Sequence, residues 1–290
     1  MAVVNVKGAK QFGLTTFLQD MFGGIVNAET KAWLAAVAAT GATTVSGYAK
    51  AVDVMISGLK TDGDWAGISD LHILAGVSTL AGVQVQIKSS ISAAVTITNT
   101  ANSDYIVSGV DAGLNDYRQG GAILGSGLPS SNVHVGALTL AANSAFGVWG
   151  NAGTGGGMIS TTAGSGMPII YQNGAATAGG VYGFGGTDFA QATTTQCVGD
   201  IQLVRESSTA GKLYVNGVLK VSLSGLSGTI PGTGNTQLWP AGSSAMRHSV
   251  AYFIAPGKDG TASQRIRARI NTALSVLGYV NGIKTFLYLG

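Results

Sequence analysis

The sequence predicts a mainly β protein: an antiparallel β-sandwich of the jelly-roll type, with an N-terminal arm, a small helical segment and a C-terminal clasp helix. Short runs in which apolar and polar residues alternate recur between residues 75 and 255. Glycine accounts for 45 of the 290 residues and divides these runs into short strands. An amphipathic helical pattern over residues 261–277 follows the last run.

The composition narrows the class of protein. Charged residues make up 10% of the chain, against about 25% in an average soluble domain, so we expect neighbouring subunits to cover much of the surface. The net charge is +3 and the basic residues are scattered, which argues against nucleic-acid binding. No run of about 18 apolar residues and no signal peptide is present, so we expect no membrane insertion and synthesis in a cytoplasm.

Residues 1–26 form the predicted arm, which is rich in bulky apolar residues. The arm either packs on its own domain or inserts into a neighbouring subunit. We favour insertion, because an apolar patch of this size in water usually marks an interface, and therefore expect a homo-oligomer. Residues 279–290 form a tail that either adds a strand or contacts a partner. The candidate partner-contact residues are Phe12, Phe17, Leu18, Met21, Phe22, Phe286 and Tyr288.

Residues 27–74 form the predicted helical segment. Asn27 can cap an alanine-rich helix over residues 28–37, which has high helix propensity. Apolar residues at helical spacing predict a second helix over 45–59. A further short helical turn is expected over 65–71, with its apolar residues in the core.

Residues 75–278 form the predicted β domain, which includes the closing helix. Its clearest hairpin runs from Lys212 to Val221, where Asn216-Gly217 supplies the two positive-φ residues of a type I′ turn. The other alternating runs predicted as strands contain Val83, Val85 and Ile87; Val95 and Ile97; Val133 and Val135; Phe146 and Val148; and Ile201 and Leu203.

The closing helix over 261–277 has its own start and stop signals. Thr261 and Gln264 can form a capping box at its N-terminus. Gly278 stands where a left-handed C-terminal cap is needed. Five apolar residues fall on one helical stripe, and the arginines are expected to face solvent or a partner. The stripe consists of Ile266, Ile270, Ala273, Leu274 and Leu277, and the arginines are Arg265, Arg267 and Arg269.

The sequence contains no recognisable catalytic arrangement. The two glutamates are Glu29 and Glu206, and the eleven aspartates occur singly, so the paired carboxylates of a glycosidase are missing. Cys197 is alone and is expected to be a small buried side chain. A glycine-rich run over 153–157 lacks the lysine of a phosphate-binding loop. We therefore expect no enzyme activity and no cofactor.

Metal binding is also not expected. His72, His134 and His248 do not have the spacing of metal ligands, so each is interpreted as a structural or surface histidine. Asp188 and Asp200 could serve as loop calcium ligands, but no calcium-loop motif surrounds them.

Three segments resemble, in the same order, parts of one known protein family. Residues 58–71 read GLKTDGDWAGISDL, residues 213–217 read LYVNG, and residues 262–279 match a terminal helix ending in LGY. These segments are similar to those of bacteriophage and prophage virion structural proteins with a concanavalin A-like, laminin-G-like sandwich. The resemblance implies that fold and a virion role, with no catalytic residues to carry over. Residues 72–76 and the N-terminal arm depart from the family's pattern.

Two hypotheses of function follow. The first is a non-enzymatic structural component of a bacteriophage virion, such as a capsid decoration, head-fibre or tail protein, which assembles with itself and docks on other virion proteins. The alternative is a carbohydrate-binding, lectin-like receptor-binding module that contacts a host-surface glycan. In that alternative, aromatic side chains form the sugar platforms. The candidate platforms are Tyr105, Tyr117, Trp149, Tyr171, Tyr182 and Trp239.

Overall fold

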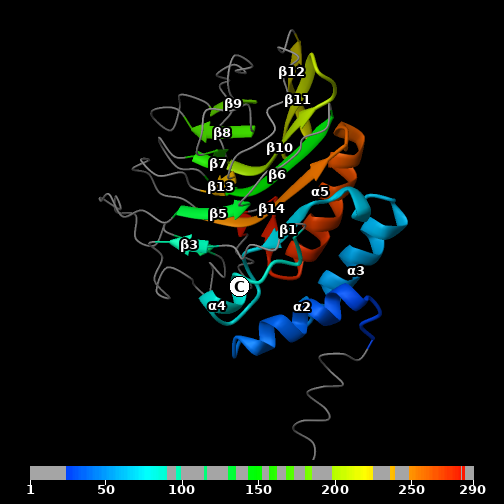
Figure 1. Ribbon diagram of the computed structural model, residues 1–290, viewed down its shortest axis with the longest axis vertical. Helices are drawn as coiled ribbons and strands as arrows, with labels where there is room; N and C mark the ends of the chain where they lie inside the picture. The colour runs from blue at the N-terminus through cyan, green and yellow to red at the C-terminus, as the bar shows by residue number, and fades with distance from the viewer. Residues whose placement is uncertain are drawn as a thin grey trace, which may run out of the picture.

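The described part of the chain consists mainly of antiparallel β-sheet with a few helices, as the computed structural model shows (Figure 1). This confirms the predicted mainly β class, while the finer assignment to a concanavalin A-like jelly roll stays a prediction. Both the predicted arm up to residue 23 and the tail from residue 285 lie outside the described residues. The structure describes residues 24–89, 96–98, 114–115, 130–134, 143–151, 157–161, 168–172, 180–184, 198–224, 236–238, 248–281 and 283–284.

The larger sheet has eight strands within the described ranges, and all its pairs are antiparallel. A short strand, β4 (Leu114–Asn115), pairs with β14 beside the main path. The remaining strands, in order across the sheet, are β12 (Val218–Ser224), β11 (Ala210–Val215), β10 (Val198–Arg205), β6 (Ser144–Asn151), β14 (His248–Pro256), β1 (Asp70–Ile73) and β2 (Lys88–Ser89).

The second sheet has six strands in the described ranges, and a small hairpin follows the last helix. The hairpin pairs β15 (Tyr279–Val280) with β16 (Ile283–Lys284). The six strands, in order, are β3 (Thr96–Thr98), β5 (Ser130–His134), β13 (Thr236–Leu238), β7 (Gly157–Thr161), β8 (Pro168–Gln172) and β9 (Gly180–Phe184).

The helices confirm the predicted helical segment in part. The two predicted helices exist, although the second begins at Tyr48 because Gly47, at φ 75°, has a left-handed backbone. The expected third helical turn over 65–71 is wrong beyond residue 67, because Leu71 lies in β1 and pairs with Phe253 of β14. The helices are α2 (Ala28–Ala39), α3 (Tyr48–Thr61), the 3-10 turn η1 (Trp65–Gly67), α4 (Leu80–Val83) and α5 (Gly260–Ser275).

Most alternating runs lie in strands, with one exception. The Asn216-Gly217 turn joins β11 to β12 with φ angles of 51° and 75°, as a type I′ turn requires. The predicted strand around Val83 and Val85 is wrong, because residues 80–83 form α4. The Thr79 side chain caps that helix by accepting a hydrogen bond from the Gly82 N–H at 3.0 Å, and this local cap overrides the alternation.

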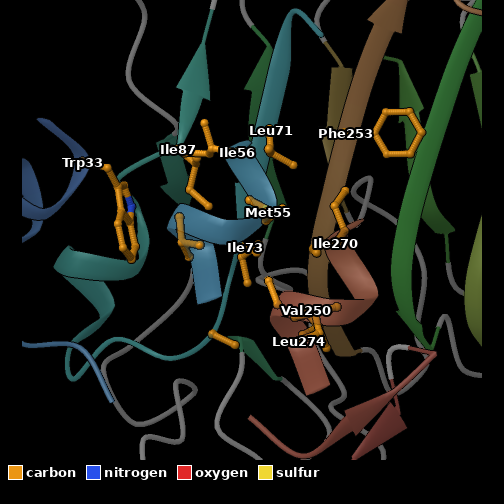
Figure 2. Close-up of a cluster of buried hydrophobic side chains, with 14 of the residues drawn as sticks. Trp33, Met55, Ile56, Leu71, Ile73, Ile87, Val250, Phe253, Ile270 and Leu274 are labelled. Carbon is orange, nitrogen blue, oxygen red and sulfur yellow. The ribbon is translucent and has the colours of Figure 1, made fainter. Parts of the chain in front are cut away.

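Helices α2, α3 and α5 lie on one side of the larger sheet, and the strands of the smaller sheet lie on the other (Figure 1). Figure 2 shows Leu71, Ile73 and Phe253 of the larger sheet in one apolar cluster with residues of α3 and α5. The central strands are also fully buried at the alternate positions, so both faces of the sheet are covered. These alternate residues are Phe146, Val148, Ile201, Leu203, Tyr252 and Ile254.

Helix α5 buries the predicted stripe but starts differently. Ile266, Ile270, Ala273 and Leu274 are fully buried, and Leu277 is 7% exposed. The predicted Thr261 capping box is wrong: Asp259 caps the helix, its carboxylate accepting from the Ala262 N–H at 2.8 Å. Gln264 does not reach back to the helix start, because its side chain donates to Gln202 in β10.

Two further features bear on the sequence predictions. Gly278 has a φ of 80°, the left-handed conformation expected after the helix. None of the helices in the described ranges has the length and apolar character needed to cross a membrane.

Candidate functional site

The arginines of α5 are bound to aspartates of the same chain. Arg265 forms a two-point ion pair with Asp64, both contacts at 2.9 Å. Arg269 pairs in the same way with Asp62, at 2.8 and 3.0 Å. The hydrogen bonds from Arg269 lower the pKa of Asp62 below its ordinary value. The prediction that these arginines simply face solvent or a partner is therefore corrected, because they join α5 to the segment after α3.

A small hollow lies between the last turns of α5 and the β15 hairpin, with a volume of about 330 Å³. The helix contributes residues three and four positions apart, which places them on one face. That face is distinct from the apolar stripe. The hollow is lined by Ala268, Asn271, Thr272, Ser275, Tyr279, Val280 and Asn281.

A hydrogen-bond network fixes the two asparagine side chains of this hollow. The Trp149 indole N–H donates to Asn271 Oδ1 at 2.7 Å, and Asn271 Nδ2 donates to Asp200 Oδ2 at 3.0 Å. Arg267 Nε donates to the other oxygen of Asp200 at 2.7 Å, and its Nη2 donates to Asn281 Oδ1 at 3.1 Å. Both amide oxygens therefore already accept a hydrogen bond, which sets the orientation of both amides.

The two hydroxyl groups that α5 contributes to the hollow are also oriented. Thr272 Oγ1 donates to the Ala268 carbonyl at 3.0 Å, and Ser275 Oγ donates to the Thr272 carbonyl at 2.7 Å. Because each hydroxyl proton is used within the helix, the oxygen atoms are left as acceptors. Among the described residues, neither hydroxyl is paired with a base, so neither has the features of an activated nucleophile, and contacts of this kind to the preceding turn are common for Ser and Thr in helices.

The lining of the hollow has no formal charge at neutral pH. Asp200 lies behind it, fully buried, and Arg267 pairs with this carboxylate. Fixed amides and hydroxyls without ionised groups suit an uncharged ligand that both donates and accepts hydrogen bonds. Within the described ranges, no group of three or more histidine, cysteine or acidic side chains converges on a metal position.

The structure corrects one candidate sugar platform. The Trp149 side chain is fully buried, packs against the Phe253 ring at 5.9 Å between centroids and is bonded to Asn271, so it offers no exposed face. Tyr171 and Tyr182 lie on neighbouring strands, but the register pairs them with Val181 and Ile170 and not with each other. Tyr105, Tyr117 and Trp239 lie outside the described residues.

The candidate partner-contact residues also lie outside the described ranges, so the structure does not test them. They are Phe12, Phe17, Leu18, Met21, Phe22, Phe286 and Tyr288.

His72 is a core residue, so the structural role is the one of the two interpretations, structural or surface, that the structure supports. It is fully buried, its Nε2 donates to the Val83 carbonyl at 2.5 Å, and its ring meets the Tyr252 ring edge to face. Burial lowers the pKa of His72 to about 4, so the ring is neutral at physiological pH. Asp200, a candidate calcium ligand in the sequence, is bound to Arg267 and Asn271.

Sequence reasoning missed the hollow. Its helical part follows the spacing of one helix face at Ala268, Asn271, Thr272 and Ser275, and this pattern of small polar residues was visible in the sequence. Asn281 carries no such signal, because it reaches the site only through the turn after Gly278.

The described residues thus form an antiparallel β protein with a small, uncharged polar hollow beside its last helix. No protein-family model and no curated protein matches the chain. The chain is similar to solved structures of clostridial toxin binding domains, at 10–12% identity. The binding domain of Paraclostridial Mosquitocidal Protein 1 matches with a TM-score of 0.42, over 71% of this chain and 53% of that one.

Two botulinum neurotoxin structures are similar at the same level. The receptor binding domain of botulinum neurotoxin D matches at 12% identity with a TM-score of 0.38, over 52% of this chain and 42% of that one. The serotype D ligand binding domain, solved in complex with N-acetylneuraminic acid, matches at 12% identity with a TM-score of 0.36, over 49% and 39%. The chain thus spans about half or less of the length of these structures.

Proposed function

We propose that this chain is a non-enzymatic, lectin-like module that recognises carbohydrate. The observation that supports this most directly is the hollow beside α5, where uncharged amides and hydroxyls are held in fixed orientations. A side chain whose position is already fixed loses little entropy when a ligand binds.

The chemistry of the hollow favours a sugar over other small ligands. A sugar hydroxyl both donates and accepts, which matches the mixture of acceptor oxygens on Thr272 and Ser275 and the amide of Asn281. Val280, which is 54% exposed, adds an apolar surface for the C–H groups of a ring. The volume of about 330 Å³ lies at the lower end of the usual range for ligand pockets, about 300–1,000 Å³, so we expect one or two sugar units to be bound.

The proposal is tested with the purified full chain on an array of neutral and acidic glycans, followed by calorimetry on the hits. We expect saturable binding to a subset of the glycans, with every ligand recovered unchanged. Failure to bind any glycan would overturn the carbohydrate-binding role. Cleavage of a bound glycan would overturn the non-enzymatic assignment.

The second candidate function is a structural component of a bacteriophage virion. The specific support is that the three segments carrying the family resemblance meet in space. Asp62 and Asp64 of residues 58–71 pair with Arg269 and Arg265 of the terminal helix. A Cβ atom at Gly217 of the LYVNG segment would lie 2.7 Å from Arg267 Nη1 on that helix. The resemblance therefore concerns residues that build one structural unit, and the virion role and self-assembly are proposed from it.

The base of the predicted arm is attached to its own chain. Ile25 is 5% exposed and belongs to the apolar core. The Asp53 carboxylate accepts from the backbone N–H groups of Val26 and Asn27 at 3.2 and 2.9 Å. Burial alone raises the pKa of Asp53, but these hydrogen bonds outweigh it and lower the pKa to about 2. An assembly test should therefore delete residues 1–23 and keep residues 24–27.

We expect the 1–23 deletion to stay folded, to form smaller species than the full chain in light scattering, and to fail to enter the particle. A full chain that is monomeric and a deletion variant that is incorporated normally would together contradict the assembly role. Electron cryomicroscopy of the particle distinguishes the head from the tail.

A further inference from the structure

We infer that the hollow between α5 and β15 takes an uncharged sugar ring, with Thr272 and Ser275 accepting from two ring hydroxyls and Asn281 donating to the ring. This inference rests on the proposed carbohydrate-binding function and adds to it the ligand class and the atoms that make contact.

The acceptors come from the helix. Thr272 and Ser275 are both exposed on α5 and three residues apart, a spacing that puts two side chains side by side, with Cβ atoms about 5–6 Å apart. Their protons are donated to the carbonyls of Ala268 and Thr272. An approaching ligand must therefore supply the hydrogen atoms, as two hydroxyl groups on one ring can do.

The donor comes from the turn that follows β15. Asn281 has a φ of 49°, a left-handed conformation that asparagine adopts more readily than most residues. Its Oδ1 accepts from Arg267 Nη2, and among the described residues its Nδ2 has no hydrogen-bond partner. We therefore assign the N–H groups of this amide as the donors at the hollow, while Arg267, itself paired with the buried Asp200 carboxylate, holds the amide oxygen in place.

The charge distribution sets the preference for a neutral ring. Among the described side chains, Arg267 is the cation that contacts a residue of the hollow, and its guanidinium is bonded to Asp200 and Asn281. A ligand carboxylate would meet a cation that is already paired with a carboxylate, so the cost of its desolvation would be offset poorly. We expect neutral sugars to bind and N-acetylneuraminic acid to bind more weakly. Because no lining group ionises between pH 6 and 8, the affinity should be constant across that range.

The test measures binding of methyl glycosides of neutral hexoses and N-acetylhexosamines, with N-acetylneuraminic acid as the acidic probe, by saturation-transfer NMR and calorimetry. Asn281→Asp keeps the oxygen that accepts from Arg267 but removes the N–H donors. Thr272→Val and Ser275→Ala each remove one acceptor. We expect each change to weaken binding about tenfold, the effect of losing one hydrogen bond worth about 1.4 kcal/mol.

Asn143→Asp is the matched control. Asn143 has the same side chain, which donates to the Gly257 carbonyl at 3.4 Å, and it does not line the hollow. We expect it to bind sugar like the unaltered chain. Thermal melting of each variant separates a loss of binding from a loss of folding.

The outcomes separate the inference from the proposed function. If the chain binds neutral sugars and Asn281→Asp, Thr272→Val and Ser275→Ala, all folded, bind equally well, the site lies elsewhere and the inference fails while the function stands. If the unaltered chain binds only the acidic probe, the assigned ligand class is wrong. If it binds no glycan on the array either, both proposals fail.

Discussion

Two parts of helix α5, residues 260–269 and residues 270–275, use their polar residues in different ways. In the first part, Arg265 and Arg269 are committed to aspartates from the segment after α3, so the charged groups join the helix to the rest of the chain. In the second part, Thr272 and Ser275 are exposed and uncharged beside the hollow. The comparison suggests that the charged residues of this charge-poor protein stabilise its fold and that uncharged residues are left for recognition.

The largest effect is expected from disrupting the apolar stripe, which both parts of α5 share. Ile270 is fully buried against the larger sheet. Ile270→Asp would place an unpaired carboxylate in that core, and we expect a loss of about 4 kcal/mol in the free energy of unfolding, or failure to fold. Val276→Asp is the control, since Val276 is 49% exposed at the end of the same helix. Denaturant unfolding measures both, and equal stabilities would show that α5 does not clasp the sheet.

A change of pH sharpens the comparison between the fold and the hollow. We expect acid to lower the free energy of unfolding, whereas sugar affinity should not respond, because the hollow has no group that titrates in this range. The folded-state pKa of His72 is lowered from 6.5 to about 4, so the unfolded chain binds more protons between these values. Stability is therefore complete above pH 6.5 and falls as the pH decreases to 4, by about 3 kcal/mol in total.

His72→Gln keeps a donor for the Val83 carbonyl and does not titrate, so its stability should change less over this window. Denaturant unfolding at each pH measures the difference. Asp53 does not interfere, because its pKa is lowered from 3.8 to about 2 and its contribution is lost only below that window. Parallel pH profiles for the two proteins would contradict the assignment to His72.

The ion pairs of Arg265 and Arg269 should contribute differently to stability, because their aspartates differ in burial. Asp64 is fully buried and is bonded to both Arg265 and Lys258, whereas the Asp62–Arg269 pair is partly exposed. We expect Asp64→Asn to cost about 2 kcal/mol in the free energy of unfolding and Asp62→Asn to cost less, because solvent screens that pair. Chemical denaturation of both variants at low and high salt provides the measurement. A larger loss for Asp62→Asn would reverse the expected order.

The smallest expected effect concerns the turn that leads from α5 into the hollow. Gly278 has a φ of 80°, which alanine adopts with strain, so Gly278→Ala should cost about 1 kcal/mol in stability. Since β15 begins at the next residue, we also expect a modest loss of sugar affinity. Ser222→Ala, at an exposed position of β12, is the control and should change neither property. An unchanged melting temperature for Gly278→Ala would show that the turn tolerates a side chain.

Local patterns in the sequence determined much of the fold. Helix propensity located α2, and helical spacing located α3 and α5 and identified the buried stripe that contains Ile266 and Ile270. The Asn216-Gly217 pair located the hairpin and its turn type. These features are predictable because periodicity and turn geometry depend on residues only a few positions apart.

Only the tertiary structure decided which polar groups meet. Arg269 and Asp62 are 207 positions apart in the chain, and Arg267 and Asp200 are 67 apart. Nothing local to an arginine indicates which distant carboxylate the fold brings beside it. The same holds for Asn281, which the turn after Gly278 brings to the hollow and whose amide oxygen then accepts from Arg267 of α5. The sequence thus determined the elements and their buried faces, while the site depends on contacts that exist only once those elements have packed, since a hydrogen bond needs both partners within about 3 Å.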